Sequence, residues 1–447
     1  MQPSKKKDWV DLVHKGVWFP PPYKRADLQV RASGKPVTAD LSTAAHEAAL
    51  LYHCYVENGR PADATFRANF WHDWRALLPA KLASKKLSDF EFVGGSDVCA
   101  AYRKALRPPP LVCQATVDGH AQPVGSCAVE GPGLFVGRGT HPSRGRLRGR
   151  ILPEDMTLNV SKGKAPPAPP GHRWGGTVTD KGAWWLARWR DPVSGKSRYV
   201  WLGTASRQQA LHDKEKLDFA RRVRSVLPRL RADIAAYLRS SVAKQRQLGV
   251  VLWLLDTLAL RVGAEGGDGR AVGVTALPAS SLRLSRDGKT LTLDFPGKDS
   301  VRYQRTVPVP KVVSVALSTG PTTGPAFPQV SAREVNAYLT RLLDGLTARV
   351  LRTFHANDLY QSRLARARDV QGLRDARLAV AEFCNHRRQT DTAAASVWQT
   401  ATSVDNYLDP RLTFAWARRH HVDDDKVFTA RQLARFAWAN KAVTYRF

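Results

Sequence analysis

The pattern of apolar residues changes near residue 206, and this change constrains the fold more than any other feature of the sequence. A mainly helical stretch at 41–106 is followed over 111–205 by short strand-like segments between glycines and prolines. Beyond the change, the apolar spacing predicts helices, which cover residues 206–263, 332–388 and 412–442. A chain of 447 residues is longer than one hydrophobic core usually holds. We therefore expect a multidomain α+β protein with a mixed α/β front half and a mostly helical back half.

Two hairpins are predicted from turn residues that lie between strand-like runs. In the front half, Trp184–Trp189 and Tyr199–Trp201 flank a turn that contains Asp191-Pro192. In the back half, Asp287-Gly288 lies between alternating apolar residues, which is a strong short-range hairpin signal. The back half should therefore carry a small antiparallel sheet within its helices.

The excess of positive charge indicates a polyanionic partner. Lys and Arg number 69 against 39 Asp and Glu, which gives a formal net charge of +30. Such an excess repels itself unless a polyanion neutralises it, and nucleic acid is the commonest one. A membrane surface is the rival partner, but the sequence has neither a clear basic amphipathic helix nor a lipidation signal. We expect double-stranded DNA as partner, no membrane, and no obligatory protein partner for a monomeric chain.

The cysteines and the N-terminus bear on the cellular compartment. The five cysteines are an odd number without a CxxC spacing, so we expect neither a disulfide framework nor a zinc site, and a reducing environment. The most apolar stretch, 248–260, is too short and too charged to span a bilayer. Residues 5–7 are lysines and no apolar segment of a signal peptide follows them.

The residues that could carry chemistry favour phosphodiester transfer without a metal. The sequence contains no Walker loop, HExxH motif or GxSxG elbow, and its carboxylates do not cluster. We therefore expect no metal, no ATP and no other cofactor. Such chemistry needs a nucleophile, cations that hold the phosphate oxygens, and an acid for the leaving oxygen. Tyr, Arg, His and Lys can supply these, although each such residue alone is more often structural.

A series of ordered blocks carries a resemblance to a known family. The blocks include HKGVWFPPPY (14–23), GPGLFVGRGTHP (131–142), LALRVG (258–263), FPGKDSVRY (295–303), LTARVLRTFHAN (346–357), FCNH (383–386) and NYLDPR (406–411). In this order, over roughly residues 9–447, the chain resembles the eukaryotic type IB DNA topoisomerases. The resemblance implies a DNA clamp with a catalytic core like that of tyrosine recombinases.

The family's active site consists of Arg, Lys, Arg, His and Tyr in that chain order. Matched block by block, these positions are Arg261, Lys298, Arg352, His386 and Tyr407. The resemblance implies that Tyr407 attacks the scissile phosphorus, that the arginines and His386 hold its oxygens, and that Lys298 protonates the 5′-oxygen. It also implies relaxation of positive and negative supercoils without ATP.

Neighbouring positions match residues that line the family's cleavage site, where camptothecin-type poisons stack. They are Arg138, Asp299 and Asn406. His141 lies in a Gly- and Arg-rich loop, which is either part of the DNA-facing clamp or an exposed turn. The resemblance therefore predicts sensitivity to such poisons.

The chain departs from the family in several places. The long basic N-terminal region and the charged coiled-coil linker before the nucleophile are missing, and the loop after Arg261 is short. We expect an N-terminal DNA-binding part at 1–205, a catalytic core at 206–390, a short linker at 391–402 and a C-terminal domain at 403–447. The nucleus is the expected compartment, with a mitochondrion, another organelle or a viral factory as alternatives.

Two other functions stay open at this stage. A tyrosine recombinase would join two DNA sites, but Arg349 stands where recombinases have the His of their HxxR motif. A catalytically inactive DNA-binding relative is the other alternative, and the complete set of five residue types argues against it.

Overall fold

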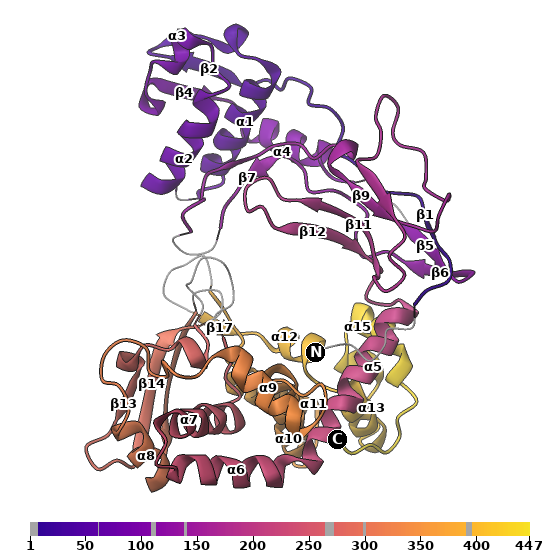
Figure 1. The fold of residues 1–447 in the computed structure, drawn as a ribbon. Coiled ribbons are helices and arrows are strands. Elements are labelled where there is room, and N and C mark those ends of the chain that lie inside the picture. The colour runs from indigo at the N-terminus through magenta and orange to yellow at the C-terminus, as the bar shows by residue number, and fades with distance from the viewer. Residues whose placement is uncertain are drawn as a thin grey trace. The chain divides into compact units, whose positions relative to one another are not determined.

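The computed structural model describes residues 8–60, 62–108, 113–137, 141–263, 272–297, 301–389 and 396–447. The chain forms two compact units, one over Lys6–Ser206 and the other over Arg207–Phe447. Figure 1 shows helices and small sheets in both units, with most of the strands in the first. The expected multidomain α+β class with small antiparallel sheets is confirmed.

One part of the first unit is a helical layer against a small sheet. Its helices are α1 (Thr43–Glu57), α2 (Ala64–Arg75), α3 (Ala80–Ala83) and α4 (Ser96–Ala105). The sheet has the order β3-β2-β4, with β2 at Gln29–Ala32, β3 at Lys35–Pro36 and β4 at Phe90–Val93. Helices α1 to α4 confirm the prediction of a mainly helical stretch at 41–106. The short strand β4 within it was not predicted, because its residues pair with β2, which lies much earlier in the chain.

Aromatic stacking forms the core of this helical layer. The rings of Tyr52 and Phe70 stack at 4.2 Å, and those of Tyr55 and Phe66 stack at the same distance. Helix α2 begins where the Asp63 side chain accepts a hydrogen bond from the amide of Phe66, as a good N-cap does. These contacts pack α1 against α2.

The remainder of the first unit is mostly sheet. One sheet has the order β1-β5-β6 (Leu12–His14, Gln114–Val117 and His120–Pro123). A second has the order β10-β9-β11-β12 (Gly176–Val178, Thr157–Asn159, Trp185–Arg190 and Ser197–Trp201). Strands β7 (Gly133–Leu134) and β8 (Leu147–Arg148) form a ribbon. The β11–β12 pair confirms the predicted hairpin, and the buried Asp191 closes its turn by accepting the amide of Ser194 at 2.8 Å.

The cysteines of this unit correct a prediction. Cys54 on α1 is disulfide-bonded to Cys99 on α4, with 5.4 Å between their Cα atoms. Cys113 is bonded to Cys127, with 6.1 Å between their Cα atoms. The expectation of no disulfides was wrong because the partners meet through tertiary packing, which sequence spacing does not reveal. Cys384 alone is free and buried, and the cysteines no longer support a reducing compartment.

The second unit is mostly helical and contains a three-stranded sheet. The helices predicted at 206–263 and 332–388 are present as α5 (Arg207–Arg222), α6 (Leu227–Arg239), α7 (Ala243–Leu258), α9 (Ala332–Leu342), α10 (Ala348–Leu364) and α11 (Val370–Phe383). Helix α8 (Lys311–Ser318) was not predicted. The predicted sheet is β13-β14-β15, at Leu282–Leu284, Thr290–Pro296 and Arg302–Pro308. The end of the chain adds β16 (Arg387–Gln389), β17 (Ser396–Trp398), α12 (Thr400–Asn406), α13 (Pro410–Arg419), α14 (Asp424–Val427) and α15 (Ala430–Arg435).

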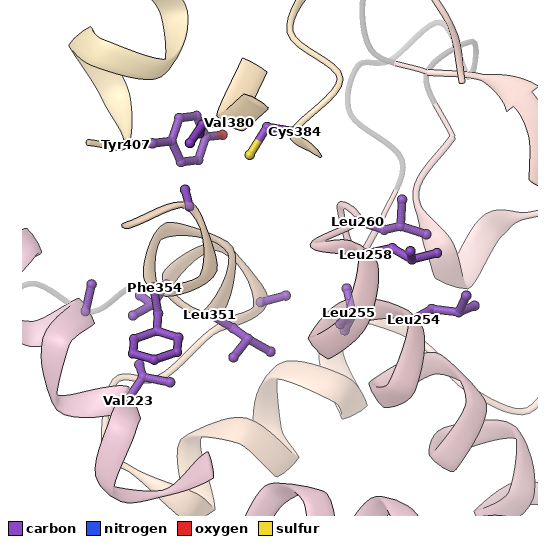
Figure 2. Close-up of a cluster of buried hydrophobic side chains, with 14 of the residues drawn as sticks. Val223, Leu254, Leu255, Leu258, Leu260, Leu351, Phe354, Val380, Cys384 and Tyr407 are labelled. Atoms are coloured by element: carbon purple, nitrogen blue, oxygen red, sulfur yellow. The ribbon is translucent and has the colours of Figure 1, made fainter. Parts of the chain in front are cut away.

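One continuous hydrophobic core holds the second unit together. Helix α10 runs through its centre and packs against α5, α7 and α11. Figure 2 shows Leu351 and Phe354 of α10 together with Leu255 and Leu258 of α7. Each such buried side chain contributes about 1.5–3 kcal/mol relative to exposure. Residues 350–357 of α10 are all buried, so the polar side chains among them are tightly packed.

Within the described part of the chain, no helix is both long enough and apolar enough to cross a membrane.

Candidate active site

Arg352 is a buried arginine on α10 that joins the ends of two other helices. Only 6% of its surface is exposed. Its Nη1 donates to the carbonyl of Ala259 at 2.6 Å, and its Nη2 donates to the carbonyl of Cys384 at 2.5 Å. Burial lowers the pKa of this guanidinium, but the nearby Cys384 thiol and Tyr407 hydroxyl outweigh burial and raise it on balance. The positive charge is therefore permanent and fixed in direction.

The chain reaches Arg261 through a sharp end to α7. The residue after the helix, Ala259, has a positive φ of 47°, a left-handed conformation that stops the helix. For a residue other than glycine this costs roughly 1–2 kcal/mol. The hydrogen bond from Arg352 to the Ala259 carbonyl helps to hold this turn. Arg261 follows two residues later and enters the same pocket as Arg352.

His386 is positioned by a similar turn after α11. Asn385 has a φ of 50°, which asparagine tolerates better than most residues do. The amide of His386 donates to the carbonyl of Ala381 at 2.8 Å and closes the helix end. The imidazole Nδ1 lies 2.8 Å from the hydroxyl oxygen of Ser403, and both residues are buried. This hydrogen bond sets the orientation of the ring.

Tyr407 lies directly after α12 and faces both basic groups. Its side chain is buried, with 8% of its surface exposed. The guanidinium carbon of Arg352 lies 5.5 Å from the centre of its ring. The ring centre of His386 lies 5.0 Å away at an angle of 36°. The phenol of Tyr407, the imidazole of His386 and the guanidinium of Arg352 thus lie next to one another.

Two adjoining pockets lie beside these three side chains. Leu260, Arg261, Arg352 and Thr402 line both of them. His386 lines the first pocket, and Asn406 and Tyr407 line the second. The structure therefore brings together four of the five predicted catalytic residues and one predicted poison-site residue.

The other predicted residues are not brought to this site by the described part of the chain. Lys298, Asp299 and Arg138 lie outside the described residues. Gly297, which precedes Lys298, lines the first pocket, and its amide donates to the carbonyl of Val301 at 2.8 Å at the end of the β14–β15 hairpin. His141 belongs to the first unit, where its ring packs against Phe135 at 4.9 Å.

Two residues at the site were missed by the sequence analysis. Thr402 lines both pockets, and Ser403 contacts His386. Both precede Tyr407 by about one helical turn, so a helix over 400–406 would have placed them beside it.

Among the described residues, no group of three or more His, Cys, Asp or Glu side chains could hold a metal ion.

Comparison with known proteins agrees with this geometry. Residues 205–410 match the family described as "Eukaryotic DNA topoisomerase I, catalytic core". Residues 7–107 and 111–202 match its DNA binding fragment, and residues 385–447 match the "C-terminal topoisomerase domain". The mitochondrial DNA topoisomerase I of Pan troglodytes is 32% identical to the chain, over 96% of the chain and 90% of the relative. The chain belongs to the eukaryotic DNA topoisomerase I family.

Other members of the topoisomerase I family differ in length from this chain. DNA topoisomerase 1 alpha of Arabidopsis thaliana is 32% identical over 99% of the chain, which covers 60% of that relative. The mitochondrial DNA topoisomerase I of Homo sapiens is 31% identical over 96% of the chain and 90% of the relative. The chain thus spans well under two thirds of the plant protein but most of the mitochondrial ones.

Proposed function

We propose that this protein is a type IB DNA topoisomerase that relaxes positive and negative supercoils. One DNA strand is cut through a 3′-phosphotyrosyl intermediate, the duplex rotates, and the strand is resealed without ATP. The observation that carries the proposal is the convergence of Arg352, His386 and Tyr407 on one pocket. Membership of the topoisomerase I family supports the same reaction.

In the proposed reaction, Tyr407 is the nucleophile. Its hydroxyl oxygen forms a bond to the scissile phosphorus while the bond from phosphorus to the 5′-oxygen breaks. The hydroxyl proton passes to water. The bond energy is kept in the phosphotyrosyl link, so that attack by the 5′-hydroxyl restores the strand without an external energy source.

The basic residues stabilise charge on the phosphate. Arg261 and Arg352 each donate to non-bridging oxygens, and His386 donates to one of them. Lys298 donates a proton to the departing 5′-oxygen. The position of Gly297 at the pocket supports this role, because it is the residue immediately before Lys298. Loss of one such donor typically costs about 10²–10³ in rate.

Plasmid relaxation in the presence of EDTA tests this function. The wild-type protein should relax both positively and negatively supercoiled plasmid without ATP or Mg²⁺. The Tyr407→Phe variant should bind DNA but lose relaxation entirely, because no hydroxyl remains to attack phosphorus. Relaxation by Tyr407→Phe would refute the nucleophile assignment. Strand exchange between two duplexes would favour a recombinase instead.

The finer features of this function are also part of the proposal. The protein acts as a monomer on duplex DNA, with a DNA-binding part at 1–205, a catalytic core at 206–390, a linker at 391–402 and a C-terminal domain at 403–447. Sedimentation of the complex with a short duplex tests the monomer. The nucleus is the proposed compartment, with the mitochondrion as the alternative because three relatives are named mitochondrial. Imaging of the tagged full chain decides between them.

Poison sensitivity is proposed for the same site. Asn406 lines the pocket beside Tyr407 and donates to the carbonyl of Thr402 at 3.1 Å. Asp299 and Arg138 complete the proposed poison site, and His141 is proposed to face DNA. Accumulation of cleaved DNA with camptothecin is the measurement, and no accumulation would remove this part of the proposal.

A further inference from the structure

Helix α10 carries a fully buried amide near the nucleophile. Asn357 lies five residues after Arg352 on this helix, and none of its surface is exposed. Asparagine is a poor helix former, and an amide buried without partners costs several kcal/mol. A buried asparagine in the middle of a core helix therefore needs hydrogen-bond partners of its own.

The partners of Asn357 are the main-chain groups on either side of Leu408. Its Nδ2 donates to the carbonyl of Tyr407 at 2.8 Å, and its Oδ1 accepts a hydrogen bond from the amide of Asp409 at 2.6 Å. A second Nδ2 hydrogen bond goes to the carbonyl of Thr353, one turn earlier on α10. The two Nδ2 bonds, each 2.8 Å long, have normal lengths, the Asp409 bond is slightly short, and all three lie in the protein interior.

We infer that Asn357 is a positioning residue for the nucleophile. Its side chain fixes the main chain of Tyr407 to α10, the helix that also carries Arg352. Because Asn357 and Arg352 lie on the same helix, this contact helps to set the distance between Tyr407 and Arg352. The inference rests on the proposed function, because it assumes that Tyr407 is the attacking group.

Other contacts hold the same segment to different elements. The buried Asp409 pairs with Arg411 at 2.7 Å and accepts from the Tyr445 hydroxyl at 3.0 Å, both within the C-terminal part. Lys216 on α5 donates to the carbonyl of Asn406 at 3.3 Å. The hydrogen bonds of Asn357 join the Tyr407–Asp409 main chain to α10. This amide therefore supports the position of the nucleophile beside Arg352, in addition to the contact of Arg352 with the Tyr407 side chain.

Positioning of this kind acts on both directions of the reaction. The phosphotyrosyl group must stay where Tyr407 was when it attacked, so that the 5′-hydroxyl can return to the same phosphorus. Loss of the amide should therefore slow cleavage and religation by the same factor. The cleavage equilibrium and the affinity for DNA should stay unchanged, because Asn357 is buried and cannot contact DNA.

The test compares Asn357→Ala with a matched control, Tyr360→Phe. Tyr360 is also fully buried on α10, and its hydroxyl forms a 2.8 Å hydrogen bond to Thr413 on α13. Both variants thus remove a buried hydrogen bond between α10 and the C-terminal part. Both should lower Tm by a few degrees, about 2–4 °C for each kcal/mol lost.

Single-turnover cleavage of a suicide oligonucleotide gives the decisive readout. We expect the rate constant of Asn357→Ala to fall about 10–100-fold, against less than about twofold for Tyr360→Phe. The rate constant reports only on folded molecules, whereas misfolding lowers the amplitude. A normal rate constant in Asn357→Ala, with reduced amplitude or Tm, would overturn the inference.

A second variant and the wild type show whether the positioning role of Asn357 or the proposed function itself is wrong. Asn357→Asp keeps the side-chain volume and the acceptor for Asp409 but replaces the amide donor to Tyr407 with oxygen. It should slow cleavage like Asn357→Ala, and normal cleavage by it would contradict the inference. If the wild-type protein forms no covalent adduct at all, the proposed function fails. If the wild type and both Asn357 variants react equally fast, only the inference fails.

Discussion

At the scale of single residues, the side chains of the site are oriented by hydrogen bonds to other groups of the protein. Arg352 donates to two carbonyls at the ends of α7 and α11, and His386 shares a hydrogen bond with Ser403. Such contacts leave each group one orientation toward the pocket. Little rearrangement is then needed when charge develops on a bound phosphate.

The Ser403 contact leads to a prediction at this scale. Ser403→Ala removes the hydrogen bond to Nδ1 and lets the imidazole of His386 turn away from the pocket. A hydrogen bond of this kind contributes about 0.5–1.5 kcal/mol, so we expect roughly a 2–10-fold slower cleavage, since 1.36 kcal/mol equals a factor of ten. Single-turnover cleavage measures it, and Ser403→Thr, which keeps the hydroxyl, should recover most of the rate. An unchanged rate in Ser403→Ala would show that this hydrogen bond does not orient His386.

At the scale of elements, a buried ion pair joins three helices of the second unit. Asp256 on α7 lies 2.9 Å from the imidazole of His355 on α10 and 3.0 Å from Arg231 on α6. Burial raises the pKa of this carboxyl, but His355 and Arg231 outweigh burial, so that the pKa lies below its usual value. Helix α7, which ends beside Arg261, is thereby fixed to α10, which carries Arg352.

The direction of this pKa gives a pH-dependent prediction for stability. Because the folded pKa of Asp256 lies below its unfolded value of about 3.9, its stabilising charge is fully present above that pH and is lost as the pH falls through the folded pKa. Asp256→Asn should therefore lower the free energy of unfolding by about 1–3 kcal/mol at pH 7. Denaturant unfolding should show this gap becoming smaller below about pH 4. A gap that widens below that pH would contradict the sign.

At the scale of the whole molecule, the net charge bears on the proposed binding to DNA. The formal charge of +30 belongs to a chain that matches topoisomerase I DNA-binding and catalytic parts over nearly its whole length. Phosphate contacts release counterions and carry little sequence information. The protein should therefore bind duplexes of different sequence with similar affinity.

Salt dependence is the prediction that belongs to this scale. Between 50 and 200 mM salt, the Kd for a short duplex should weaken by about 10³–10⁵, the range for roughly 6–10 phosphate contacts. Fluorescence anisotropy over a salt series measures it, with a duplex of unrelated sequence as the control. A slope that is near zero, or that differs between the two sequences, would contradict binding through phosphates.

The parts of the fold that follow local rules were predictable from sequence. The helices of the second unit repeat apolar residues at helical spacing, and the β13–β15 sheet turns at Asp287-Gly288. Strand β4 and the two disulfides were not predicted, because each depends on a partner far away in the chain. Local patterns carry no information about such partners.

The site likewise has parts that could be predicted from the sequence and parts that could not. The resemblance supplied the residue types in order, and the described ones among them meet at the pockets. The supporting contacts were not predictable: Asn357 lies 50 residues from Tyr407, and Lys216 lies 190 residues from Asn406. The assignment of Lys298, Asp299 and Arg138 stays a prediction, because they lie outside the described residues.

The β16–β17 ladder has a consequence for how this chain tolerates insertions. Gln389 pairs with Ser396, and the amide of Gln399 donates to the carbonyl of His386 at 2.7 Å. The histidine and the start of α12 are thus fixed to each other by strand pairing rather than by the length of chain between them. Loop-closure entropy grows only by about 0.6 kcal/mol for each doubling of length. A long segment inserted between the two strands, or a break in the chain there, would leave both ends of the ladder facing the same pocket.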